Sequence, residues 1–168
     1  MTISMYQASV PAFLQMLNSL SAILDKAETD TTARKIDPSV LLNYRLAPDM
    51  LPLISQIRIA GDFSKGCVAR LAGVEIPKFE DNETTLPEAK ARIARTVKFI
   101  ENFKPADIDG SEERDIALTV GGQAMNFKGQ TYLVNFVMPN FYFHVTTAYD
   151  ILRHCGLHVG KRDFMGQV

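Results

Sequence analysis

The chain has 168 residues, a length that suits a single domain with one hydrophobic core. Its 18 Lys and Arg residues against 19 Asp and Glu residues give a formal charge of −1, which disfavours binding to nucleic acid or to anionic lipid. The N-terminal segment lacks the pattern of a secretory signal and no later stretch has the length and apolarity of a membrane span, so we expect one soluble, cytoplasmic domain over residues 1–168.

The first part of the chain has helical periodicity. Apolar residues recur at spacings of three and four over residues 6–24, which predicts a first amphipathic helix. Pro11 falls within this pattern, so the helix either begins at Ser9 or kinks at Pro11. The polar segment 26–38 predicts a loop, and a short turn of helix is expected over residues 39–44.

Two further helices are indicated by their start and stop signals. One is predicted to open at residues 47–49 and to end near Gly73. The other follows Thr85, which can form a capping box with Glu88 at a helix start. Four cationic residues of this third helix are predicted to form a solvated face: Lys90, Arg92, Arg95 and Lys98.

A β-hairpin is predicted over residues 115–127. Apolar residues alternate on both sides of Gly121-Gly122, which supplies a two-residue turn. This turn pairs Leu118 with Met125 and Ile116 with Phe127. All four side chains then lie on one face, which should pack on the helices because an isolated hairpin is only marginally stable.

The final helix is predicted from about Gln130 to Cys155, with Gly156 as its stop and a kink at Pro139. An unbroken apolar stripe places one face in the centre of the bundle. The stripe consists of Val134, Met138, Phe141, Val145, Ala148, Leu152 and Cys155. The sequence therefore predicts a mainly α fold, a four-helix bundle with a short β-hairpin before the last helix.

Polar residues interrupt the neighbouring stripe of this final helix. Asn140 and His144 are four residues apart, so their side chains point to one place and can share a ligand, a metal or water. Gln56 falls on the inner side of the second helix and can face the same space, and Tyr44 can line it. The alternative is a structural histidine whose ring nitrogens are satisfied by Asn140 or by a neighbouring helix.

Several segments carry a resemblance to a known family. The closing stretch 143–156 resembles the last helix of the DinB/YfiT-like superfamily, with Leu152, Arg153 and Gly156 matching its Leu-Arg-x-x-Gly ending. Four segments are more similar to an uncharacterised bacterial domain-of-unknown-function family within it. They are Leu46-Ala47-Pro48-Asp49-Met50, Ala69-Arg70-Leu71-Ala72-Gly73, Pro139-Asn140-Phe141-Tyr142-Phe143-His144 and Gly160-Lys161-Arg162-Asp163-Phe164.

The resemblance implies a four-helix bundle, and it also implies a metal site that this sequence has altered. In the superfamily, one His of the second helix and a His-x-x-x-His pair of the last helix hold a divalent metal, and some members are thiol-dependent transferases or isomerases. These positions fall on Gln56, Asn140 and His144, so only His144 is retained. Because an amide is a poor ligand for zinc or nickel, we expect no cofactor. The resemblance also implies a homodimer.

The leading interpretation is a DinB-like bundle in which Gln56, Asn140, His144 and Tyr44 surround a small-molecule pocket. If the protein is catalytic, His144 is the general acid or base, because its reference pKa lies near neutrality. Two alternatives remain: a metal-dependent transferase or hydrolase in which His144 is a metal ligand, and a structural or interaction module without catalysis.

Overall fold

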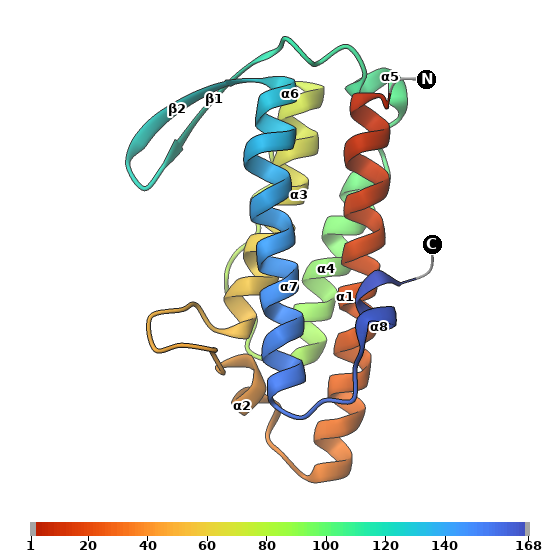
Figure 1. Ribbon diagram of the computed structural model, residues 1–168, viewed down its shortest axis with the longest axis vertical. Coiled ribbons are helices and arrows are strands. Elements are labelled where there is room, and N and C mark those ends of the chain that lie inside the picture. The colour runs from red at the N-terminus through yellow and green to blue at the C-terminus, as the bar shows by residue number, and fades with distance from the viewer. Residues whose placement is uncertain (1–2, 167–168) are drawn as a thin grey trace.

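The computed structural model describes residues 3–166 and contains four long helices (Figure 1). Their bounds are α1 Met5–Arg34, α3 Leu53–Ala72, α4 Leu86–Ile100 and α7 Met138–His154. Shorter elements connect them: α2 Pro38–Leu42, α5 Pro105–Ile108, β1 Asp115–Val120, β2 Gln123–Lys128, α6 Gly129–Thr131, the π-helical η1 Tyr132–Val137, and α8 Lys161–Met165. The predicted mainly α bundle with a hairpin before the last helix is confirmed.

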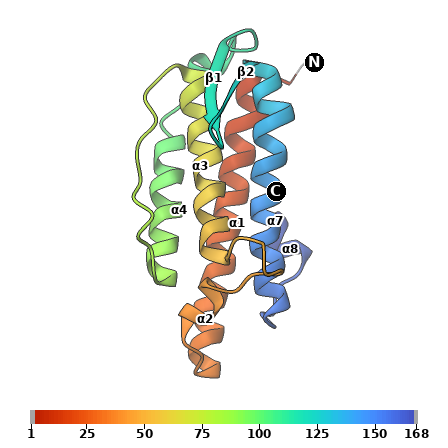
Figure 2. The ribbon, with the colours of Figure 1, turned by 90° about the vertical axis from the view of Figure 1, so that its left-hand side faces the viewer.

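The four helices do not alternate in direction. Helices α1 and α7 run one way along the bundle, whereas α3 and α4 both run the other way (Figures 1 and 2). The connection over residues 73–85 must therefore travel the length of the bundle before α4 begins. One long crossover of this kind is a recognised variant of the four-helix bundle.

The core lies where these helices meet. Helix α3 packs against α7 and α4, and α1 packs against α4. The rings of Phe13 on α1 and Phe141 on α7 meet edge to face with centroids 4.9 Å apart, and both side chains are fully buried. Burial of this apolar surface is the main favourable contribution to the stability of the bundle.

The first helix is longer than predicted at both ends. It begins at Met5, where Ser4 and Gln7 form a capping box, so the expected start at Ser9 is wrong. It continues through the expected loop 26–38 as far as Arg34. Thr31 shows why: its side chain is buried in the bundle and its hydroxyl donates to the Ala27 carbonyl, so packing outweighs the low helix propensity of this polar segment.

The second long helix begins later than predicted. Residues 47–49, which were expected to open it, lie in a turn, and α3 starts at Leu53 after Pro52. Its end agrees with the prediction, because Gly73 caps the helix in the left-handed conformation at φ 72°. The third helix begins as predicted with the capping box of Thr85 and Glu88.

The predicted solvated face of α4 is wrong at Arg92. This side chain is 1% exposed, because the crossover covers it. Its guanidinium pairs with Asp62 of α3 at 3.1 Å and, from the crossover, with Asp81 and Glu83, each at 3.0 Å. Glu83 also accepts from Nε of Arg58 at 2.8 Å. These ion pairs, of which Arg92–Glu83 is buried on both sides, tie the crossover to both α3 and α4.

The hairpin has the predicted register. Leu118 pairs with Met125 and Ile116 pairs with Phe127. Gly121 and Gly122 form the turn at φ 56° and 81°, values that the mirror-image hairpin turn needs and that glycine adopts without strain. The apolar face rests on the last helix, where the rings of Phe127 and Phe136 have centroids 5.1 Å apart.

The last helix contains a π-helical segment that the sequence pattern does not reveal. In η1 the Met138 amide donates to the Leu133 carbonyl five residues earlier. Leu133 therefore takes the inward position predicted for Val134, which is 50% exposed instead. From Phe141 to Leu152 the predicted stripe is buried, Cys155 is partly buried, and the helix stops before Gly156 at φ 92°. Within residues 3–166, no helix combines the length and apolarity needed to cross a membrane.

Candidate functional site

Two of the predicted site residues meet across the bundle. Gln56 lies in the first turn of α3 and His144 lies in α7, and Nδ1 of the imidazole is 2.6 Å from Oε1 of the amide. Gln56 is only 2% exposed, and His144 is half-buried. The two residues are 88 positions apart in sequence, so their contact depends on the packing of α3 against α7.

The orientation of the Gln56 amide determines which nitrogen of His144 carries the proton. Nε2 of Gln56 donates to the Leu51 carbonyl at 2.9 Å, so the other end of the amide, Oε1, is an acceptor. Nδ1 of His144 must therefore be the donor, and in the neutral ring Nε2 carries the lone pair. No residue in the described part of the chain hydrogen-bonds this Nε2 atom.

Aromatic rings surround the imidazole on two sides. The Phe63 ring is stacked at 20° with centroids 5.9 Å apart, and the Phe143 ring stands perpendicular at 5.3 Å. Burial lowers the pKa of His144 from its ordinary value, because desolvation disfavours the charged ring. The site therefore presents a neutral imidazole whose basic nitrogen has no partner among the described residues.

The structure does not bring Asn140 and Tyr44 to this contact. The Asn140 amide donates to the Phe136 carbonyl at 2.7 Å, at the junction of η1 with α7. Tyr44 lies at the end of the α2 turn, and its hydroxyl is 3.0 Å from Nε2 of His154. The tyrosine and histidine rings pack with centroids 5.6 Å apart. The predicted group of four residues is therefore divided over three places.

The residues around His144 do not fit the metal site that the resemblance implies. Zinc and nickel sites in such bundles need several imidazole, thiolate or carboxylate donors directed at one point. Gln56 instead uses its oxygen to accept from His144 and its nitrogen to donate to Leu51. Across residues 3–166, no group of three or more His, Cys, Asp or Glu side chains has a suitable arrangement.

Sequence reasoning missed the role of the Leu51 carbonyl and of the Phe143 ring. The carbonyl lies in the turn before α3, and its position depends on a loop conformation that no periodicity encodes. Phe143 is 56% exposed and lies outside the predicted central stripe, so helical spacing assigns it no role. A large exposed aromatic next to a candidate histidine was the available signal.

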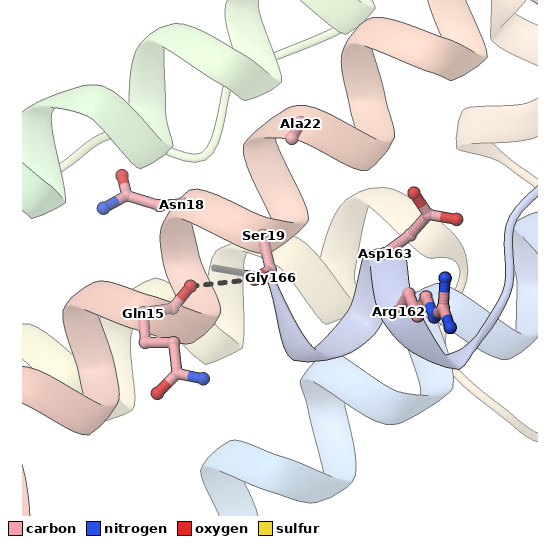
Figure 3. Close-up of a pocket in the computed structure, with 7 residues that line it drawn as sticks. All are labelled: Gln15, Asn18, Ser19, Ala22, Arg162, Asp163 and Gly166. Atoms are coloured by element: carbon pink, nitrogen blue, oxygen red, sulfur yellow. Dashed lines mark hydrogen bonds between the residues drawn. The ribbon is translucent and has the colours of Figure 1, made fainter. Parts of the chain in front are cut away.

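A cavity of about 520 Å³ between α1 and α8 has no comparable chemistry (Figure 3). Its hydroxyl, on Ser19, donates to the Gln15 carbonyl at 3.0 Å. Its carboxylate, on Asp163, is bound by Lys26 at 2.6 Å, and this hydrogen bond holds the pKa of Asp163 below its ordinary value. Because these groups are already paired within the protein, His144 is the better candidate.

Comparison with known proteins agrees with the fold. The family model described as "Domain of unknown function (DUF1993)" matches residues 5–165. A crystal structure of a DinB family member protein from Shewanella denitrificans is similar, with a TM-score of 0.88 and 43% sequence identity. The match covers 97% of this chain and 92% of that chain. No curated protein matches the chain.

Proposed function

The chain belongs to the DUF1993 family, and we propose that its DinB-like bundle binds a small molecule at His144. The observation that carries the proposal is the hydrogen-bonded series from the Leu51 carbonyl through Gln56 to Nδ1 of His144. A buried amide that orients a half-buried imidazole fixes its tautomer and leaves one basic nitrogen available. Such fixed polar groups inside apolar surroundings are typical of ligand sites.

The free ring nitrogen of His144, Nε2, determines which chemical groups a ligand needs. A neutral imidazole nitrogen accepts a hydrogen bond, so the ligand carries an O–H, N–H or S–H group at the point of contact. The rings of Phe63 and Phe143 favour an apolar group next to that donor. Because burial lowers the pKa of His144, the acceptor form is retained at neutral pH.

The same geometry supports general-base chemistry if the bound group is acidic. Nε2 takes the proton of the ligand, the ring becomes an imidazolium, and Nδ1–H donates a stronger, charge-assisted bond to Gln56. Gln56 is then a positioning residue, because it acts through the imidazole. As a neutral amide it stabilises the imidazolium less than a carboxylate would.

The test compares ligand binding by the wild type, by His144→Ala and by His154→Ala. His154 is an exposed histidine of the same helix, so its variant is the matched control. In a thermal-shift and NMR screen of small alcohols, phenols, amides and thiols, we expect at least one compound whose affinity falls tenfold or more in His144→Ala and is unchanged in His154→Ala. Hits that bind all three proteins equally would instead support a structural role for the Gln56–His144 contact.

Metal analysis of protein purified without an affinity tag separates this proposal from a metal-dependent transferase or hydrolase. Stoichiometric zinc or nickel that is lost in His144→Ala would favour the metal-dependent enzyme. A homodimer and a cytoplasmic location remain predictions from the resemblance and from the sequence. Sedimentation equilibrium of the purified chain measures the former, and cell fractionation measures the latter.

A further inference from the structure

A second cavity lies under the hairpin, away from the Gln56–His144 contact. It has a volume of about 230 Å³, is open to solvent, and is lined by residues of α3, β1 and η1. Figure 1 shows the hairpin extending outward from the top of the bundle, and Figure 2 shows it in front of the upper part of α3. The residues that carry the argument are Asp62, Phe63 and Arg70 from α3, Leu118 from β1, and Tyr132 and Phe136 from η1.

Arg70 brings a positive charge to this cavity without an internal counter-ion. Its Nη1 atom donates to the Gly66 carbonyl at 3.2 Å and to the Tyr132 hydroxyl at 3.0 Å. None of the ion pairs in the described part of the chain includes Arg70. Its side chain is half-buried, and a cation held partly away from water is stabilised when an anion pairs with it.

Tyr132 adds a second donor beside the guanidinium. Its ring is 1% exposed, and burial raises the pKa of its phenol to about 12, so the hydroxyl keeps its proton at neutral pH. The hydroxyl oxygen accepts from Arg70, and no residue among 3–166 accepts a hydrogen bond from its proton. Two adjacent donors, one of them a guanidinium, match the two oxygens of a carboxylate.

Apart from Asp62 and Thr119, the remaining lining residues are apolar or aromatic. The rings of Phe63 and Phe136 have centroids 5.8 Å apart, and Phe136 is also stacked on Tyr132 at 6.0 Å. Leu118 covers them from the hairpin. The only carboxylate in the lining is Asp62, which is already paired with Lys65 and Arg92.

We propose that this cavity binds a small monocarboxylic acid with an aromatic or branched apolar body. The carboxylate accepts from Arg70 and Tyr132, and the apolar body lies between Phe63, Phe136 and Leu118. The volume of about 230 Å³ corresponds to roughly eight water molecules at about 30 Å³ each, which suits a small ligand. The carboxylate donors of this site, Arg70 and Tyr132, are distinct from the imidazole proposed as the other site, although the Phe63 ring borders both.

The experiment uses phenylacetate, benzoate and isovalerate as probes, with phenylacetamide as the neutral analogue. Binding to the full chain is measured by NMR chemical-shift perturbation and calorimetry. We expect at least one carboxylate to bind at millimolar concentration or better and to shift the resonances of Leu118 and Tyr132. Phenylacetamide should bind at least tenfold more weakly than phenylacetate, because it lacks the charge that pairs with Arg70.

Three variants locate the site. Arg70→Met keeps the apolar stem and should lower carboxylate affinity tenfold or more, and Tyr132→Phe should lower it severalfold. Arg153→Met, which removes an exposed arginine of α7, is the control and should leave binding unchanged. If Arg70→Met fails to fold, Leu118→Trp fills the cavity while keeping both donors, and it should abolish binding.

Three results would overturn the proposal. They are no binding of any of the three carboxylates, equal binding of phenylacetate and phenylacetamide, and carboxylate affinity that is unchanged in Arg70→Met or Leu118→Trp. His144→Ala should keep the preference for phenylacetate over phenylacetamide, because that preference depends on Arg70 and Tyr132 and not on the Phe63 ring that His144 contacts. Failure at one site is thereby distinguished from failure at the other.

Discussion

Arg92 Nη1 and Glu83 Oε1 lie 3.0 Å apart, and both side chains are almost completely removed from water, at 1% and 3% exposure. Arg92 belongs to α4 and Glu83 to the crossover, so this pair holds a long, mostly polar connection against the bundle. Removing one partner would leave the other charge buried with fewer hydrogen bonds.

We therefore predict that Arg92→Met destabilises the protein by about 3 kcal/mol or more. Loss of a buried cation leaves the desolvation cost of the Glu83 carboxylate compensated only by its remaining pairs, chiefly with Arg58, and the crossover should loosen. Urea denaturation followed by circular dichroism measures the change. Lys98→Met is the control, because Lys98 is an exposed cation of the same helix, and it should change stability by less than about 0.5 kcal/mol.

Acid should weaken the same contact. Burial of Glu83 acts to raise its pKa, but hydrogen bonds from Arg92, its own backbone and Arg58 outweigh burial, so the pKa lies below the ordinary value of 4.5. The folded state thus binds this proton more weakly than the unfolded state does. Its contribution to stability is present above about pH 4.5 and is lost as the pH falls through the lower folded-state pKa.

The free energy of unfolding should consequently fall more steeply below pH 4.5 in the wild type than in Glu83→Gln, which has no carboxylate to protonate at this position. Denaturant titrations at a series of pH values measure how the free energy of unfolding changes with pH in each protein. Equal slopes in the two proteins would show that Glu83 does not carry the acid dependence.

The residue at position 56 should control the titration of His144. In the wild type, burial lowers the pKa of the imidazole. Gln56→Glu places a carboxylate at hydrogen-bond distance from Nδ1, which favours the imidazolium, so the pKa of His144 should rise above about 6.5. Gln56→Leu removes the acceptor without adding charge, and the pKa should stay low. NMR titration of the His144 ring measures all three proteins.

Two substitutions should build the metal site that the sequence has altered. Gln56→His together with Asn140→His supplies one imidazole from α3 and an i, i+4 pair from α7. We expect this double variant to bind zinc or nickel stoichiometrically and the wild type to bind them weakly. Adding His144→Ala to the double variant should remove the gain. Elemental analysis and calorimetry measure the bound metal. A double variant without metal affinity would show that side chains at positions 56, 140 and 144 cannot meet at one metal ion.

Local sequence signals predicted the elements that depend on local chemistry. The glycine turn and alternating pattern gave the hairpin register of Ile116 and Leu118, and the capping box at Thr85 gave the start of α4. These features are determined within a few residues, so a single sequence contains the necessary information. The fold class followed because apolar stripes at helical spacing must be buried against one another.

The errors occurred where tertiary contacts outweigh local preference. Thr31 was assigned to a loop by composition, yet its burial in the bundle keeps it helical. Arg92 was assigned to the surface, because nothing in the pattern of α4 indicates that the crossover passes over it. For the candidate site, helical spacing identified Gln56 and His144, whereas the position of Tyr44 depends on a loop.

The π-helical segment η1 allows the last helix to differ in length by one residue between relatives. A π turn closes its hydrogen bond over one residue more than an α turn does, so the helix from Gly129 to His154 accommodates an additional residue without rotating its two ends. A relative that lacks one residue between Tyr132 and Val137 can form an ordinary α-helix there. An alignment gap at this point would then mark a change of helix type, while the residues equivalent to Tyr132 and His144 keep their facing directions.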